Sequence, residues 1–275
     1  MKLTERLVVV LVSGAVLGAP AVGRAQDWSG GYLGGHLGLS KIPEGKAENN
    51  VILFDKDLNG VFNDTILTAA GANAFSPGFC AGVSASALPS GGCTVDDVGV
   101  DFGVRGGYDW QRGSFLVGVL AELAAPDHID SVTAFSTTPA FYTFTRELDW
   151  LTGFRGRAGA VWGPALLYGT GGLAWAKITN SFKTSNVVNT FVQNADDMSW
   201  GYQAGGGAEF RVGKVAIGGE YLWTTVMDED RFTVRAQGPA PATNPFILTN
   251  ANGTDFRRAD RLEFGALRGH VSFRF

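Results

Sequence analysis

Apolar and polar residues alternate along eight stretches of this 275-residue chain. Successive side chains of a β-strand point to opposite faces, so the alternation predicts strands with one apolar face and one polar face. The pattern is clearest at the C-terminal end, where Leu267, Val271 and Phe273 alternate with Arg268, His270, Ser272 and Arg274. The predicted strands cover residues 28–40, 99–111, 114–124, 146–162, 165–178, 197–212, 214–227 and 261–275.

The connections between these strands alternate in length. Tight turns are expected at Arg112-Gly113, at Gly163-Pro164 and at Gly213, and long loops over 41–98, 125–145, 179–196 and 228–260. An even number of strands with short turns at one end and long loops at the other is typical of outer-membrane barrels. We therefore expect an all-β fold, an eight-stranded antiparallel up-and-down transmembrane β-barrel over 26–275, with long external loops of which 41–98 is the first.

A soluble barrel of eight strands is the alternative, and it would turn its apolar residues inward around a ligand. Acidic and basic residues share one face of the predicted strands, where they can neutralise each other inside a narrow lumen. Side chains alone can fill an eight-stranded barrel. We predict a lumen plugged by a polar network of Arg105, Glu147, Asp149, Arg155, Arg157, Gln203, Glu209, Arg211, Glu220, Arg268, His270 and Arg274.

The first 25 residues have the pattern of a cleaved secretory signal peptide. Lys2 and Arg6 precede the apolar run Leu7–Leu17, and Gly23-Arg24-Ala25 offers small residues for cleavage. A buried N-terminal helix is the alternative. Without this segment the chain has 19 basic and 25 acidic residues, a net charge of −6. That balance argues against nucleic acid as a partner.

Glycine and cysteine fit the same interpretation. The 39 glycines lie largely inside predicted strands beside aromatic residues, where they permit the curvature that a closed sheet needs. Cys80 and Cys93 are the only two cysteines. Because they lie close together in a chain expected to be exported, we predict a disulfide between them.

One motif in the first long loop matches half of a calcium-binding loop. Asp55, Asp57 and Asn59 alternate before Gly60, the spacing that brings side-chain oxygens around one ion, and the Val61 carbonyl would add a ligand. The twelfth position is Ile66 in place of glutamate, so Asp64, Asp96 or Asp97 would have to complete the site. A solvated turn rich in Asp, Asn and Gly is the alternative.

No motif supports a catalytic site. Gly169–Ala174 matches a dinucleotide-binding pattern, but a strand continues where a helix should begin. His270-Val271-Ser272 resembles the His-x-Ser pair of outer-membrane lipid A deacylases, which act at the outer leaflet. Here the pair lies near the opposite end of the predicted barrel and faces the lumen, so we expect no enzyme.

Three segments resemble the small outer-membrane β-barrel family of alphaproteobacteria, often described as porin-like surface antigens. They are Asp27–Gly35, Gly103–Trp110 and Tyr168–Ala174, and the resemblance extends over the whole mature chain. The terminal Phe273-Arg274-Phe275 resembles the signal by which the barrel-assembly machinery recognises such proteins. The resemblance implies the fold and says little about activity.

These observations lead to one functional expectation and one alternative. We expect a non-enzymatic protein of the Gram-negative outer membrane, embedded in outer-membrane lipids, with a plugged lumen, no cofactor other than calcium in the first loop, and loops that contact an external ligand. The alternative is a narrow porin for small solutes.

Overall fold

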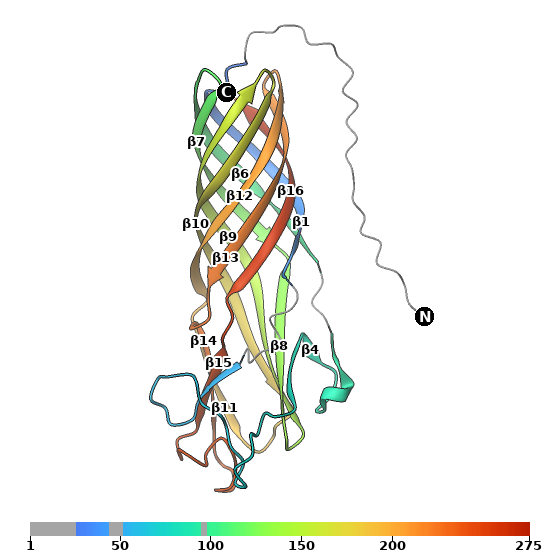
Figure 1. The fold of residues 1–275 in the computed structure, drawn as a ribbon, viewed down its shortest axis with the longest axis vertical. Coiled ribbons are helices and arrows are strands. Elements are labelled where there is room, and N and C mark those ends of the chain that lie inside the picture. The colour runs from blue at the N-terminus through green and yellow to red at the C-terminus, as the bar shows by residue number, and fades with distance from the viewer. Residues whose placement is uncertain (1–25, 44–51, 95–97) are drawn as a thin grey trace, which may run out of the picture.

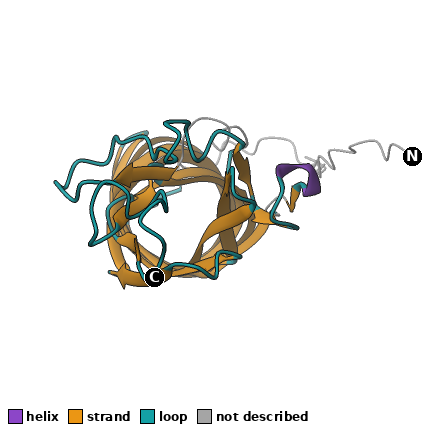
Figure 2. Ribbon diagram, turned by 90° about the horizontal axis from the view of Figure 1, so that it is seen from below, coloured by secondary structure: helices purple, strands orange, loops and turns teal. Residues whose placement is uncertain are grey.

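The computed structural model describes residues 26–43, 52–94 and 98–275. The predicted signal peptide over 1–25 lies outside these residues, as do Asp96 and Asp97. No helix among the described residues is long and apolar enough to cross a membrane. Eight long antiparallel strands form a closed barrel (Figures 1 and 2): β1 (Gly30–Lys41), β6 (Gly99–Arg112), β7 (Phe115–Pro126), β9 (Ala140–Trp162), β10 (Ala165–Thr184), β12 (Met198–Val212), β13 (Val215–Met227) and β16 (Leu262–Arg274).

The first and last strands close the barrel by pairing with each other. β1 pairs with β16 from Tyr32 opposite Arg274 to Lys41 opposite Gly265, and its other edge pairs with β6. Around the barrel the order is β1, β6, β7, β9, β10, β12, β13 and β16. The predicted eight-stranded antiparallel barrel is therefore confirmed.

Tight turns connect the strands at the end of the barrel where the C-terminus lies (Figure 1). Gly113 and Gly163 have φ angles of +63° and +58° in these turns. Residues with side chains rarely adopt that conformation, so glycine is the favoured residue there. All three predicted tight turns are present.

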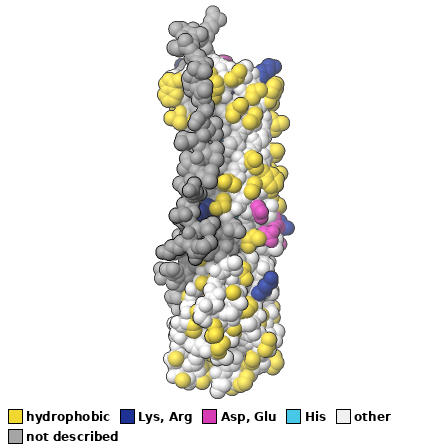
Figure 3. Space-filling view, turned by 90° about the vertical axis from the view of Figure 1, so that its right-hand side faces the viewer, with side chains coloured by type: hydrophobic (Ala, Val, Ile, Leu, Met, Phe, Trp, Pro, Cys, Tyr) yellow, Lys and Arg dark blue, Asp and Glu magenta, His cyan; other side chains and the backbone are white. Residues whose placement is uncertain are grey.

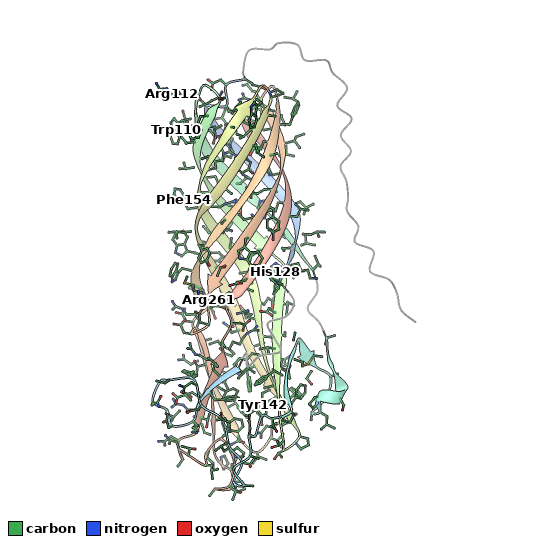
Figure 4. All side chains as sticks on the ribbon, in the orientation of Figure 1. Trp110, Arg112, His128, Tyr142, Phe154 and Arg261 are labelled. Carbon is green, nitrogen blue, oxygen red and sulfur yellow. A yellow bond between two sulfur atoms is a disulfide. The ribbon has the colours of Figure 1, made fainter. Side chains whose placement is uncertain are left out.

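The outer wall of the barrel is apolar. Trp110 and Phe154 project outward from the ribbon (Figure 4), and hydrophobic side chains gather around the barrel half of the molecule (Figure 3). Every barrel strand contributes an exposed apolar residue, for example Leu37, Phe102, Leu123, Phe154, Leu173, Tyr202, Ile217 and Val271. A wall of this kind is stable in contact with lipid and unfavourable in contact with water.

Some inward-facing glycines leave space for aromatic rings. A Cβ atom on Gly107 would lie 2.5 Å from the Tyr32 hydroxyl oxygen, and one on Gly207 would lie 2.8 Å from that of Tyr168. Both tyrosines are buried in the lumen. Inside the narrow barrel, these glycines therefore make room for tyrosine rings that come from the neighbouring strand.

Beyond the membrane-facing wall the strands continue into an external β-sandwich. β9 begins at Ala140 and β10 ends at Thr184, so both extend past their predicted ends. The remaining elements, all in segments predicted as loops, are β2 (Ile52–Asp55), β3 (Gly78–Ala81), β4 (Val83–Ser84), a 3-10 turn (Pro89–Gly91), β5 (Cys93–Thr94), β8 (His128–Ser136), β11 (Thr190–Ala195), β14 (Phe232–Gln237) and β15 (Thr254–Arg258).

The sandwich packs two sheets around an aromatic core. The extended ends of β9 and β10 lie in one sheet with β8 and β3, and the other sheet has the order β11, β14, β15, β2. The core includes Phe54, Phe75, Tyr142, Phe144, Phe182, Phe232, Phe246 and Phe256. The alternation rule missed β8 because its residues are buried at nearly every position, so apolar and polar residues do not alternate along it.

The first long loop forms part of this sandwich. β2 pairs with β15, and Phe54, Ile66 and Phe75 pack into the aromatic core. The predicted disulfide is present: Cys80 on β3 and Cys93 on β5 have Cα atoms 6.3 Å apart. The disulfide therefore ties the β4–β5 hairpin to the edge of the sandwich.

Cysteine labelling tests the orientation of the barrel. A cysteine at Thr137 or Val187, at the tip of the sandwich, should react with an impermeant thiol reagent in intact cells, because outer-membrane barrels place their long loops outside. A cysteine at Ser114, exposed in the β6–β7 turn, should react only after the cells are lysed. Labelling in the opposite pattern would show that the topology is inverted.

Candidate functional site in the barrel lumen

The lumen contains a charge-balanced network of buried side chains. Five arginines and five carboxylates, each at most 4% exposed, point inward among the described residues. Equal numbers of the two charges let every carboxylate lie near a guanidinium, which offsets the cost of removing both from water. The residues are Arg105, Arg155, Arg157, Arg268, Arg274, Asp101, Asp109, Glu122, Glu209 and Glu220.

In the middle of the barrel two arginines each bridge two carboxylates. Arg155 donates to Glu220 at 3.0 Å and to Glu122 at 2.9 Å. Arg268 donates to Glu122 at 2.7 Å and to Asp101 at 2.5 Å. These charge-assisted bonds connect β6, β7, β9, β13 and β16 across the lumen, so the network holds opposite walls of the barrel together.

A second group lies closer to the tight turns. Arg157 donates to Asp109 at 2.8 Å and to Glu209 at 2.6 Å, and Arg274 donates to Asp109 at 2.5 Å. Arg274 also donates to the backbone carbonyl of Trp28, whose side chain is fully buried. At this end of the lumen Trp28 packs in an apolar cluster with Leu116, Val161, Leu166, Tyr168 and Ala216.

The remaining polar residues extend the network. Nε2 of His36 lies 3.4 Å from Asp101, and Nε2 of His270 lies 3.3 Å from Glu209. The Gln203 amide donates to Thr224 at 3.2 Å. The structure thus brings nine of the twelve predicted network residues together in the lumen: Arg105, Arg155, Arg157, Gln203, Glu209, Glu220, Arg268, His270 and Arg274.

The predictions for Glu147 and Asp149 were wrong. Glu147 is exposed, and Asp149 lies at the outer surface, 3.1 Å from the Nζ atom of Lys177. The cause is a β-bulge: Lys177 pairs with Trp150 and Ile178 with Leu148, so Asp149 is an extra residue in β9. One extra residue exchanges the inner and outer faces of a strand, and Arg146 points inward in place of Glu147.

Arg211 is also not part of the buried network. It is partly exposed at the rim, where it donates to the carbonyls of Gly213, at 2.8 Å, and Asp27. Its guanidinium lies 5.9 Å from the centre of the Trp28 ring. The residue faces inward as the alternation predicts, but β12 ends beside it and leaves the side chain in contact with solvent.

Sequence reasoning missed Glu122 and a second charged cluster. Glu122 follows the same alternation as its buried neighbours Leu116 and Leu120, which would have identified it. The second cluster, called here the junction cluster, lies where the barrel meets the sandwich and consists of Asp130, Arg146, Asp228, Arg258 and Asp260. Four of its members, all except Arg146, come from segments predicted as loops, so no periodicity pointed to them.

Arg146 is the centre of the junction cluster. It donates to Asp130 at 2.7 Å and to Asp228 and Asp260 at 2.9 Å each, while Arg258 donates to Asp260 at 2.8 Å. Burial alone would raise the pKa of the Asp260 carboxyl, but Arg258 and Arg146 outweigh that effect and lower it to about 2. Burial alone would lower the pKa of the Arg146 guanidinium. The three aspartates around it outweigh that effect and raise the pKa.

The structure also brings together part of the predicted calcium site. Ligand atoms of Asp55, Asp57 and Asp64 all lie within 4.8 Å of one another. The Asp55 carboxylate accepts the backbone N–H groups of Asn59, at 3.0 Å, and Gly60, at 2.8 Å. Hydrogen bonds of this kind close an Asp-rich turn without an ion, as the alternative interpretation requires.

Removing one arginine from the lumen should destabilise the barrel strongly. Arg157→Leu leaves Asp109 and Glu209 buried with fewer partners, and we expect a loss of about 3–5 kcal/mol in the free energy of unfolding in urea. Arg112→Leu, at the exposed end of β6, is the matched control and should cost less than about 0.5 kcal/mol. Equal effects of the two substitutions would contradict a stabilising network.

The junction cluster should make stability depend on acid pH. Because the pKa of Asp260 falls from an ordinary value of 3.8 to about 2 in the folded state, its contribution is present above pH 4 and is lost as the pH falls towards 2. The shift corresponds to about 2 kcal/mol. Urea unfolding between pH 5 and 2 should therefore show a smaller decrease in stability for Asp260→Asn than for the unmodified protein, and parallel curves would exclude this role.

Comparison with known proteins agrees with this geometry. The model of the outer membrane protein β-barrel domain family matches residues 7–275. The chain is 26% identical over 201 residues to the 31 kDa outer-membrane immunogenic protein of Brucella melitensis, covering 72% of this chain and 71% of that protein. It is 30% identical over 125 residues to the 22 kDa outer membrane protein of Rhizobium leguminosarum bv. viciae, covering 45% and 51% of the two chains.

Among solved structures, OprG from Pseudomonas aeruginosa is similar with a TM-score of 0.49 at 11% identity, over 91% of this chain and 99% of that one. The resemblance to alphaproteobacterial outer-membrane barrels that the sequence motifs indicated is confirmed by the family model and by the curated relatives. The chain belongs to the outer membrane protein β-barrel family and is a protein of the outer membrane.

Proposed function

We propose that this protein is a non-enzymatic outer-membrane barrel whose lumen does not pass solutes and whose external sandwich makes its contacts outside the cell. The observation that supports the proposal best is the order of buried residues along β9. From the tight-turn end outward the large ones are Val161, Arg157, Arg155, Leu151, Leu148, Arg146, Phe144 and Tyr142.

Each of these residues belongs to a cluster of buried side chains. Val161 belongs to the apolar layer around Trp28, and Arg157 and Arg155 belong to the lumen network. Leu151 and Leu148 pack with Val226, Leu262 and Phe264 in a second apolar layer. Arg146 and the aromatic core follow. An ion on this path would lose its hydration in each apolar layer, which is costly.

A narrow porin is the second candidate, and one observation favours it. Buried polar atoms of Tyr32, Arg105 and Gln203 have no hydrogen-bond partner among the described residues. Such atoms usually bind water, so the network itself can hold a hydrated space. For conduction, the apolar layers at both ends of the network would have to open.

An enzymatic role has little support in the arrangement of side chains. Ser272 of the predicted His-x-Ser pair is 3% exposed inside the lumen, and His270 beside it contacts Glu209. A lipid or peptide substrate would have no route to this pair. We infer that both residues serve the packing of the network.

We also propose partners for the exposed apolar surfaces of the barrel. The apolar wall would contact outer-membrane lipids, and the exposed rings of Phe273 and Phe275 would contact the barrel-assembly machinery during insertion. Binding of calcium through Asp55, Asp57, Asn59 and the Val61 carbonyl stays a prediction.

Conductance in planar bilayers separates the two candidates. Folded protein, verified by its heat-dependent migration on gels, should give no steady openings, whereas a general porin in the same bilayer should. Reproducible openings whose ion selectivity changes in Arg105→Gln would place the conducting path in the lumen and support the porin. Arg105 is chosen because Glu220, 3.7 Å away, keeps Arg155 as a partner after the substitution.

A further inference from the structure

One edge of the external sandwich is a strand that is paired on one side alone. β11 lies at the end of the sheet β11-β14-β15-β2 and pairs with β14 from Thr190 opposite Gln237 to Ala195 opposite Phe232. No other strand of the described residues pairs with β11. β11 is labelled in the external half of the molecule in Figure 1, so its free edge is accessible from outside the cell.

Alternate residues of β11 direct their backbone groups to the free edge. The backbone N–H of Asp196 donates to the carbonyl of Arg231, directly opposite in the same register, at 2.8 Å. In an antiparallel pair, residues that exchange hydrogen bonds with the partner strand alternate with residues whose N–H and C=O groups point away from it. The residues of β11 whose backbone groups face the free edge are therefore Phe191, Gln193 and Ala195.

The opposite edge of the same sheet follows the same alternation and is covered by the chain itself. Carried across β14 and β15, the alternation directs the backbone carbonyl of Phe54 in β2 to the outer edge. There it accepts the backbone N–H of Asp64 at 2.9 Å. The segment after β2 therefore caps one edge of the sheet, whereas no backbone hydrogen bond between described residues reaches the free edge of β11.

The sequence of β11 lacks the features that protect edge strands. Thr190–Ala195 contains no proline, no glycine and no charged residue, and its pairing with β14 has no bulge. All of its residues except Phe191 are exposed. Native proteins usually protect such an edge with a lysine, a proline or a bulge, because unpaired backbone groups are a template for another strand. An unprotected edge on an external sheet therefore indicates a site for a partner.

We propose that β11 binds an extended peptide segment of another protein, which adds to the sheet as a fifth strand. Unpaired backbone N–H and C=O groups in a row recognise an extended backbone, as in other cases of strand addition. This proposal rests on the proposed function, because it identifies the partner class of the external sandwich.

The side chains of β11 indicate which peptides suit the edge. Phe191 packs against the aromatic core, so the alternate residues Thr190, Val192 and Asn194 face away from it. These three are neutral, and uncharged β-branched or aromatic side chains pair well beside them. Asp197 is exposed just beyond the strand, so a basic residue suits that end of the peptide.

A second copy of this chain fits the edge less well. β11 runs towards the barrel, because the carbonyl of Asp197 just beyond it accepts the backbone N–H of Ile178, a residue of the apolar cluster between barrel and sandwich, at 2.8 Å. Two copies in one membrane point the same way, so their β11 strands could pair only in parallel. Parallel pairing is the less stable arrangement, whereas a peptide is free to bind antiparallel.

Selection from a peptide library tests the proposal. Short random peptides displayed on phage are selected on the full protein in nanodiscs with one copy per disc, after depletion on empty nanodiscs. The selected peptides should alternate β-branched or aromatic residues and have a basic residue at one end. Methylation of every second backbone nitrogen of such a peptide should abolish binding, and methylation of the intervening nitrogens should not, since alternate N–H groups face β11.

Two substitutions at one position separate backbone pairing from side-chain contact. Gln193→Pro removes an N–H group that faces the free edge and none that bonds to β14, and proline is tolerated at such edge positions. It should weaken binding of the selected peptide about fivefold or more. Gln193→Ala is the matched control, because it keeps the N–H group, and it should bind the peptide as the unmodified protein does.

Hydrogen exchange in the unmodified protein locates the bound peptide. Exchange of the Gln193 and Ala195 amides should slow about tenfold or more when the peptide binds, and that of Val192 should change little, because it already bonds to β14. The proposal is overturned if no peptide binds above empty nanodiscs, if both methylated series bind equally, or if Gln193→Ala weakens binding as much as Gln193→Pro.

Protection of the β11 amides that needs two copies in one disc and no peptide would assign the edge to a second copy, and would also overturn the proposal. A conducting lumen would refute the proposed function and leave the peptide results unaffected, so the two proposals fail separately.

Discussion

The pairing of β1 with β16 determines most of what this protein is. A sheet that closes on itself has no free edge, so every barrel strand finds hydrogen-bond partners within the chain, as a lipid environment demands. Closure also divides the side chains into an outer set that faces lipid and an inner set that faces other side chains. The inner set here is charged, and the lumen is too narrow to hydrate ten charges fully. Charge pairing across the lumen follows from closure.

The bulge at Asp149 then changes which residues of β9 face inward where the barrel meets the sandwich. On the tight-turn side of the bulge, odd-numbered residues of β9 face inward, and on the sandwich side even-numbered ones do. The exchange brings Arg146, Phe144 and Tyr142 inside, where they form the junction cluster and the aromatic core. It also places Asp149 beside Lys177 at the outer surface. A single extra residue therefore separates a barrel with a polar interior from a sandwich with an aromatic one.

This division separates two roles that the proposed function assigns to different parts of the molecule. In the proposed function the barrel half, with its charge-balanced interior and an apolar cluster on either side of it, serves as an anchor. The external half has a dry aromatic core that supports loops in fixed positions. Rigid loops on a stable base are the usual setting for binding sites. In the proposed function, contacts outside the cell would therefore depend on the loop residues and not on the barrel.

The eight barrel strands, the tight turns and most of the lumen network could be predicted from the sequence, because each depends on a period of two that local side chains reveal. The family followed from the motifs beside Tyr32, Tyr108 and Tyr168. Tertiary structure alone decided the rest. The bulge shifted Glu147 and Asp149 outward, and β8 is buried along nearly its whole length, so no periodicity marks it. The junction cluster needs residues from distant segments, and such contacts exist only after the strands have packed.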